Sequence, residues 1–404
     1  MNAFGIDWGR LFTFVSLFEQ GKRQNLLSVD DGRRKRIAHA VERTRKLWGS
    51  EAVALAPESF DVSDVGEAAW WQPSQKSAFF WKCLAKRLET YCGGFAAAIN
   101  YETRIAVQAL ADSPRLTEVA QMAQDVGLPN VQAVSATDAL LARWLGEERP
   151  SEECHVAAVV VGDTATLLTL MRLRPADSGS VRIHRTLQTS LPYGAWSWAT
   201  HLRYLVNQRM HESLPATWEI AWQDALQEFG LRLSEASETQ EVLWNGPGRD
   251  RSYAPFTLTP RQCSEWETVR GFQSDLRVAL GSHPRPNWVL LGGLGAEWPF
   301  ARNVARTLAL CWQTTSPNTA IAEGAALLPS LALTFVTASD AWPIEQTTAL
   351  VTPFEVAAYP PVEPMGNMFS LDPTLSPDDH PVVLPFPDET VVLDPLPKPT
   401  KEIL

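Results

Sequence analysis

Three short apolar runs open the chain, at positions 4–8, 11–18 and 24–29, and each is separated from the next by a glycine and polar residues. Runs of this length with such breaks are typical of β-strands joined by tight turns. The pattern therefore predicts an antiparallel β-meander at the start of the chain.

A second set of three runs begins about 150 residues later, at positions 156–163, 165–173 and 181–190. Patterns of helical period follow each set. An internal duplication of this kind indicates two α/β lobes of like topology.

Residues 112–127 carry a complete helix pattern. Pro114 suits the first turn and Gly127 suits the end of the helix. One face of this helix is apolar and holds Leu116, Val119, Ala120, Ala123 and Val126. Similar patterns predict helices at 136–147, 194–210, 218–236 and 299–310, and strands at 131–134 and 287–291.

The last part of the chain differs from the rest in composition. Residues 351–404 hold nine acidic residues and two lysines, which is −7 of the net charge of −11, and 12 of the 29 prolines. Proline prevents the propagation of helix or central strand, so we expect an extended tail. Its regularly placed apolar groups leave two roles open, a linker or a segment that packs along the body or docks on a partner. We divide the chain into 1–150, 151–335 with a helical subdomain, and an acidic tail at 336–404.

Composition limits the classes of function. The chain has 404 residues, 45% hydrophobic and 20% charged, with neither a membrane-length apolar run nor a signal-peptide pattern, so we expect a cytoplasmic protein without a membrane partner. Its acidity argues against nucleic-acid binding. The five cysteines show no CxxC pair and are expected to be reduced packing residues.

Several segments, taken in order, resemble one family. The stretch "FGIDWGR" at 4–10 looks like a first phosphate motif and "VVVGDTATLLTL" at 159–170 like a second. Residues 99–103 followed by 119–144 look like the stretch leading into a connecting helix, 289–305 like an adenosine motif and 316–331 like a closing helix. In this order they resemble the actin-like ATPase superfamily, and most closely the nucleotide-binding domain of DnaK-type heat-shock chaperones, without the peptide-binding domain.

The resemblance implies a two-lobed actin-like ATPase fold with duplicated ribonuclease H-like lobes and a proline-rich C-terminal extension. In such proteins ATP and magnesium lie between the lobes, the phosphates on glycine-rich turns. It makes Asp7 and Asp163 candidate catalytic residues and Asp7 the candidate metal ligand. The implied nucleotide contacts are Gly5, Asp7, Gly9, Arg10, Gly162, Asp163, Thr164, Gly292 and Gly293. Two alternatives stay open, namely that Asp7 caps its own turn and that glycines after a buried strand serve packing.

The motifs also depart from the family. Alignment on Gly162 puts Val160 at the second acid position, and valine cannot ligate magnesium. Asp163, on the other side of Gly162, is the candidate that would substitute for this acid. Trp8 and Arg10 are not standard in the first motif. The glutamate and proline before the connecting helix and the cations of the adenine clamp are replaced by Ser135, Ala136, Ser237, Gln240 and Glu241.

These losses favour a degenerate member, a protein-interaction or scaffold subunit with an unidentified protein partner, in which hydrolysis is lost and binding of ATP and magnesium is weak or absent. The sixteen tryptophans fit interface anchors or core residues. The alternative is a magnesium-dependent ATPase whose lobe closure switches a partner, which an Asp163 facing Asp7 would favour. A sugar or acetate kinase ranks last because residues 91–111 lack a distinctive acid motif.

Overall fold

A computed structural model of the chain describes residues 2–9, 12–25, 37–42, 47–49, 52, 61–62, 75–176, 179–207, 225, 228–230, 232–233, 235–244, 256–281 and 284–336. The chain divides into two units, Met1–Trp342 and Pro343–Leu404. Every described residue belongs to the first unit. The candidate Arg10 and the tail beyond Val336 lie outside the described residues, as does most of the helix predicted at 218–236.

The first sheet begins with the predicted meander, although its third strand covers Lys22–Asn25 and residues 26–29 of the predicted run lie outside the described residues. Its strands are β1 (Ala3–Trp8), β2 (Phe12–Glu19), β3 (Lys22–Asn25), β8 (Glu102–Val107) and β9 (Val131–Ser135) in the order β3-β2-β1-β8-β9, and β4 (Ile37–Ala38) also pairs with β2. Strands β1 to β3 are antiparallel, whereas β1, β8 and β9 are parallel. The β2–β3 turn needs left-handed backbone, which Gln20 and Gly21 supply with φ of 51° and 77°.

The second sheet repeats this arrangement, so the second predicted meander is also confirmed. Its strands are β10 (Cys154–Val161), β11 (Thr166–Pro175), β12 (Val181–Leu191), β15 (Trp288–Gly292) and β16 (Leu310–Gln313), with β17 (Leu333–Val336) added beside β12. Strands β10 to β12 are antiparallel, and β10, β15 and β16 are parallel. The pairing of β17 with β12 extends the folded body to Val336. The chain is an α/β protein, as predicted.

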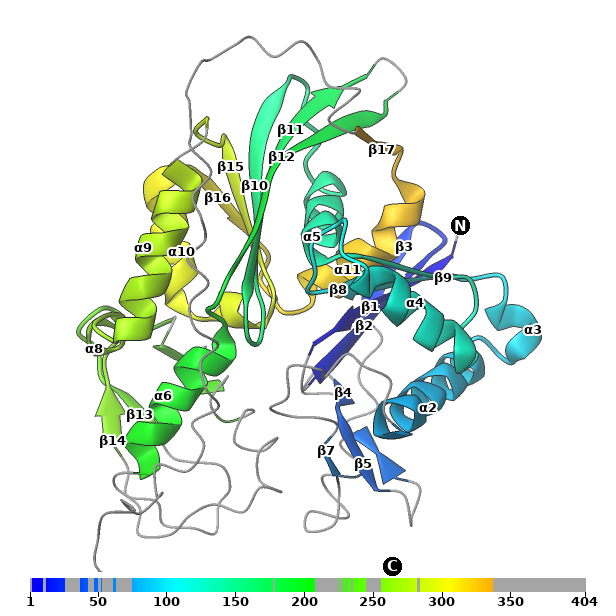
Figure 1. Ribbon diagram of the computed structural model, residues 1–404, viewed down its shortest axis with the longest axis horizontal. Coiled ribbons are helices and arrows are strands. Elements are labelled where there is room, and N and C mark those ends of the chain that lie inside the picture. The colour runs from blue at the N-terminus through cyan, green and yellow to red at the C-terminus, as the bar shows by residue number, and fades with distance from the viewer. Residues whose placement is uncertain are drawn as a thin grey trace, which may run out of the picture. The chain divides into compact units, whose positions relative to one another are not determined.

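Two helices lie between the sheets, and each packs on the sheet of the other repeat (Figure 1). Helix α5 (Ala136–Leu145) follows the last strand of the first sheet but packs on β10, β11 and β15 of the second. Helix α11 (Ala320–Leu327) follows the second sheet but packs on β1, β2 and β8 of the first, and the two helices contact each other. Alanine and glycine dominate α11, which lets backbones approach closely.

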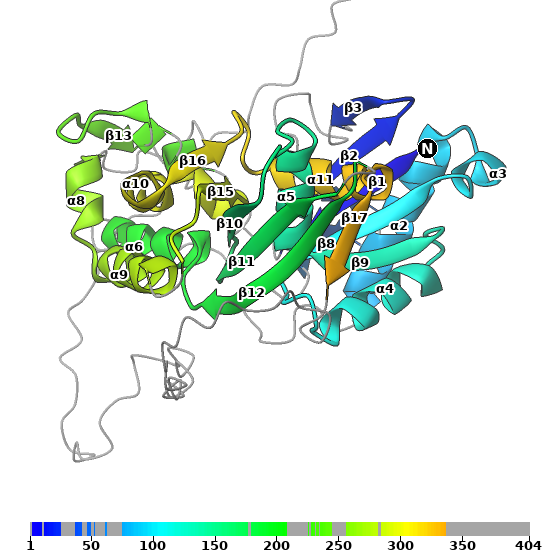
Figure 2. The ribbon, with the colours of Figure 1, turned by 90° about the horizontal axis from the view of Figure 1, so that it is seen from above.

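The outer faces carry the remaining long helices. Helices α2 (Gln75–Tyr91) and α4 (Arg115–Asp125), with the short α3 (Phe95–Ala98), cover the first sheet, while α6 (Ala195–Asn207), α9 (Glu267–Gly281) and α10 (Pro299–Leu308) cover the second (Figure 2). The smaller elements are β5 (Ala40–Glu42), β6 (Leu47–Trp48), β7 (Asp61–Val62), β13 (Val242–Trp244), β14 (Phe256–Leu258), α8 (Pro260–Ser264), η2 (Leu294–Glu297) and η3 (Leu328–Ser330). Within the described residues, no helix has the length and apolar character needed to cross a bilayer.

Most described tryptophans are core residues rather than surface anchors. The fully buried set is Trp8, Trp81, Trp144, Trp198, Trp244 and Trp298. Trp8 stacks on Trp81 of α2 with ring centroids 4.2 Å apart. This packing explains the non-standard residue of the first motif, because the Trp8 side chain fills the outer core of its sheet. It also removes the support that these residues lend to an interaction surface.

Candidate functional site

One backbone hydrogen bond is common to the first turns of the two meanders. In the first, the Gly9 N–H donates to the Phe12 carbonyl over 3.1 Å, and in the second the Gly162 N–H donates to the Ala165 carbonyl over 2.9 Å. This equivalence places Asp7 and Val160 at matching positions of β1 and β10. Val160 is buried against α5 in the core, so the second turn has no carboxylate at the position that holds Asp7 in the first.

Asp163 reaches the first turn from the second sheet. A Cβ atom built on Gly9 would lie 3.0 Å from Oδ2 of Asp163, so the absence of a side chain at position 9 makes room for this carboxylate. Both Asp7 and Asp163 are buried, with 7% and 6% of their surfaces exposed. The structure therefore brings together three residues that the sequence singled out, Asp7, Gly9 and Asp163.

Burial dominates the electrostatics of Asp7. The residue lies on the inner face of β1, because Phe4, Ile6 and Trp8 alternate with it and pack in the outer core. Loss of solvation raises the pKa of the Asp7 carboxyl well above its usual value of 3.8, and the negative charge of Asp163 raises it further. Two nearby acids in such a place either share a proton or neutralise a cation, and perturbed acids of this kind are common at functional sites.

Three of the predicted nucleotide-contacting glycines have close protein neighbours. A Cβ atom on Gly5 would lie 2.0 Å from the Ala322 carbonyl oxygen of α11, and one on Gly292 would lie 2.7 Å from Cδ1 of Leu140. Gly293 has a φ of 91°, and a Cβ atom there would lie 2.5 Å from the Val161 carbonyl oxygen. Close packing is therefore sufficient to explain why these positions are glycine.

The second turn is covered on two sides. The Gln108 side chain lies on Gly162, where a Cβ atom would be 1.8 Å from Nε2. On another side, the first N–H groups of α6 bond to the turn: Ala195 donates to the Gly162 carbonyl over 2.9 Å and Trp196 to the Asp163 carbonyl over 2.6 Å. Thr164, the next residue of the turn, is partly exposed.

Other roles are found at the positions matched to the glutamate and proline before the connecting helix and to the adenine clamp. Ser135 directly precedes α5, but its side chain does not cap the helix; instead its hydroxyl donates to the Ala109 carbonyl over 2.7 Å. The stretch matched to the adenine clamp is a turn followed by β13 rather than a helix. Among the described residues no group of three His, Cys, Asp or Glu side chains is placed to hold a metal, so protein carboxylates beside a cation here would be Asp7 and Asp163.

Sequence reasoning overlooked Gln108. It directly follows the carboxyl end of β8, and β8 is parallel to β1 with Val107 beside Trp8. Polar residues just after parallel strands are frequent site residues, so this position could have been singled out. What could not be read from the sequence is that Gln108 contacts Gly162 of the other sheet.

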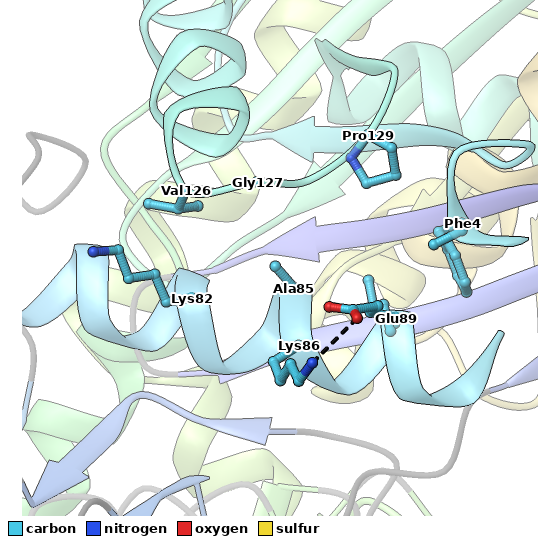
Figure 3. Close-up of a pocket in the computed structure, with 10 residues that line it drawn as sticks. Phe4, Lys82, Ala85, Lys86, Glu89, Val126, Gly127 and Pro129 are labelled. Carbon is cyan, nitrogen blue, oxygen red and sulfur yellow. Dashed lines mark hydrogen bonds and ion pairs between the residues drawn. The ribbon is translucent and has the colours of Figure 1, made fainter. Parts of the chain in front are cut away.

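A separate pocket of about 380 Å³ lies on the other face of the first sheet, between α2, α3 and the loop after α4 (Figure 3). Its lining comprises Phe4, Lys82, Ala85, Lys86, Leu88, Glu89, Ala98, Val126, Gly127 and Pro129. Lys86 pairs with Glu89 over 3.1 Å at the exposed rim. None of the predicted site residues lines this pocket.

The chain matches no protein-family model, and no curated protein is similar to it.

Proposed function

We propose that the described body has an actin-like ATPase fold, related to the nucleotide-binding domain of DnaK-type chaperones. Two observations support this fold. The two sheets share one strand order and one set of strand directions. The helix that ends each repeat packs on the sheet of the other repeat, as expected when a duplicated chain builds a two-fold-like pair of lobes.

We propose further that this protein is an interaction or scaffold subunit that has lost nucleotide hydrolysis. The observation that carries this proposal is the bonding of the α6 N-terminus to the Gly162 and Asp163 carbonyls. A helix N-terminus beside a glycine turn is a natural anion site. Here the first two N–H donors of the helix are already bonded to carbonyl oxygens of the turn, so these donors are not available to a phosphate.

A second candidate is a magnesium-dependent ATP-binding switch. The contact of Asp163 with the first turn, close enough to raise the pKa of Asp7, favours it. In that case Asp7 and Asp163 would hold the magnesium ion, which would neutralise phosphate charge. Val160 and the covered second turn count against this candidate.

Calorimetry separates the two candidates. We expect the full chain to give no binding heat with ATP and magnesium, and no phosphate release above background. The measurement is made on the wild type beside Asp7→Ala and Asp7→Asn. Micromolar affinity that both variants lose would reject the scaffold proposal and make Asp7 the anchor of a working site.

The acidic tail is the proposed docking segment for a protein partner. Its charge and apolar residues fit an extended strand that adds to a sheet edge or lies in a groove. We expect removal of residues 351–404 to weaken partner association or lower solubility while the body keeps one cooperative unfolding transition. Thermal unfolding of the truncated chain measures its cooperativity, and sedimentation measures its association and solubility. A truncated chain that no longer unfolds cooperatively would show that the tail belongs to the folded domain.

A further inference from the structure

The segment that joins β8 to α4 contacts the second sheet at two points. At its start, the Gln108 side chain lies on the turn after β10, with its three terminal atoms 1.8 to 2.1 Å from the position of a Cβ atom on Gly162. Three residues later, the Ala111 N–H donates to Oε1 of Gln188 in β12 over 3.1 Å. The first contact requires glycine at position 162, so the two residues fit as a pair.

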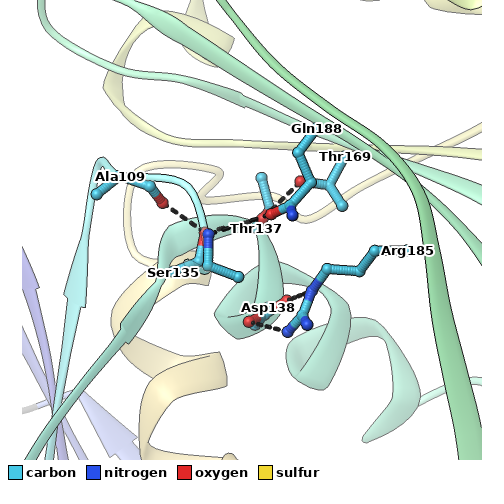
Figure 4. Close-up of polar contacts among 8 residues, drawn as sticks. Ala109, Ser135, Thr137, Asp138, Thr169, Arg185 and Gln188 are labelled. Atoms are coloured by element: carbon cyan, nitrogen blue, oxygen red, sulfur yellow. Dashed lines mark hydrogen bonds and ion pairs between the residues drawn. The ribbon is translucent and has the colours of Figure 1, made fainter. Parts of the chain in front are cut away.

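A buried polar chain holds the middle of the same segment (Figure 4). The Ser135 hydroxyl donates to the Ala109 carbonyl and lies 3.0 Å from Oγ1 of Thr137. Thr169 of β11 donates to the same Thr137 oxygen over 3.0 Å. Ser135, Thr137 and Thr169 are buried. A buried hydroxyl that loses its hydrogen-bond partner costs more free energy than an exposed one, because no water replaces the partner. These hydrogen bonds therefore oppose separation of α5 from the second sheet.

An ion pair adjoins the polar chain. Arg185 of β12 binds Asp138 of α5 through two hydrogen bonds, with 2.7 Å between Nη2 and Oδ2. The guanidinium also lies over the ring of Phe335 in β17, 4.1 Å from its centre. Asp138 is buried, and removing one member of a buried pair leaves the other uncompensated.

We propose that residues 108–111 form a strap that holds the two sheets in one fixed arrangement beside the Asp7 and Asp163 carboxylates, with Gln108 as its positioning residue. Closure and opening of two lobes requires the turn after β10 to move relative to β8. The contacts of Gln108 and Ala111 cross this boundary and would break in that movement. The body therefore presents one conformation to its partners. This inference does not depend on whether nucleotide binds.

Hydrogen exchange of backbone amides tests the strap, because the Ala111 N–H bonds directly to Gln188. We expect this amide to be protected in the full-length wild type and to exchange about three- to tenfold faster in Gln188→Ala, the range for loss of one net hydrogen bond. Gln108→Ala should also make the Ala111 amide exchange faster. Gln121→Ala, an equal truncation on the exposed face of α4, should leave the Ala111 amide unchanged.

A double variant checks the pairing of Gln108 with Gly162. We expect Gly162→Ala to displace Gln108, so that Gly162→Ala, Gln108→Ala and their combination show the same Ala111 exchange rate, because each removes one shared contact. Adding ATP with magnesium should change none of these rates, whatever the calorimetry finds. An unprotected Ala111 in the wild type, additive effects of the two substitutions, or an exchange pattern that ATP changes would each overturn the strap. If the position-162 variants do not fold, the Ala111 exchange rate in Gln188→Ala still tests the strap.

Discussion

Replacing Gly5 with alanine should destabilise the body severely, by about 3 kcal/mol or more, because the added methyl group has no space. The new Cβ atom would lie 2.0 Å from the Ala322 carbonyl oxygen and 2.3 Å from the Ala326 amide nitrogen. Both are backbone atoms of α11, so no side-chain rotation relieves the overlap. Either α11 separates from β1 or the strand distorts. The measurement is the free energy of unfolding from urea denaturation.

A matched control uses the same substitution where space is open. Gly281 ends α9, and a Cβ atom there would meet nothing within 4 Å. Gly281→Ala should be neutral or slightly stabilising, because alanine restricts the unfolded chain. Gly324→Ala tests the other side of α11, where the new atom would lie 1.8 Å from the Ala139 carbonyl oxygen of α5. If Gly5→Ala and Gly324→Ala were as stable as Gly281→Ala, the crosswise packing of the two helices would be wrong.

Replacing Asp7 with asparagine should stabilise the protein at neutral pH, by about 1–3 kcal/mol, because it removes a buried charge at nearly constant volume. Burial and the neighbouring Asp163 both raise the Asp7 pKa in the folded state. Between the usual value of 3.8 and the higher folded value, the folded protein holds more protons than the unfolded chain. Wild-type stability therefore falls as pH rises through this window, and the full cost of the charge is present above it.

The gain in unfolding free energy from Asp7→Asn should accordingly vanish near pH 3.8 and grow as the pH rises. Thermal unfolding midpoints of the wild type and the variant across pH 3.5 to 8 measure it, over a range set by that expected window. Asp112→Asn, at an exposed position, serves as the control for the same change of side chain. A variant less stable than the wild type at neutral pH would mean that the Asp7 charge is compensated. Magnesium that stabilised the wild type but not the variant would then favour the ATP-binding switch.

Strands and turns were predictable where the signal is local. The runs that became β1 to β3 and β10 to β12 need only alternation and a glycine break, and the helix pattern at 112–127 ends where Gly127 adopts a φ of 99°. Such features depend on neighbours in sequence. The short β17 was not predicted, because its apolar residues directly follow the last helical segment and a strand forms there only by pairing with β12.

The candidate site was predictable only in part. Asp7, Gly9 and Asp163 could be named from the two turns, since an acid and a glycine after an apolar strand are visible in the sequence. Their meeting depends on how two turns more than 150 residues apart face each other. Gln108 carried a weaker signal, and its contact with Gly162 is invisible without the fold.

The buried glycines have roles that depend on residues far away in the sequence. The sequence could indicate that Gly5, Gly292 and Gly293 allow something to approach the backbone closely. It could not say whether a phosphate or another part of the chain approaches. In the folded protein the neighbours are α11, Leu140 and Val161. The α/β class and the two meanders follow from local periodicity, whereas the roles of these glycines, the buried tryptophans and the strap follow from contacts between distant segments, which only packing of the whole body creates.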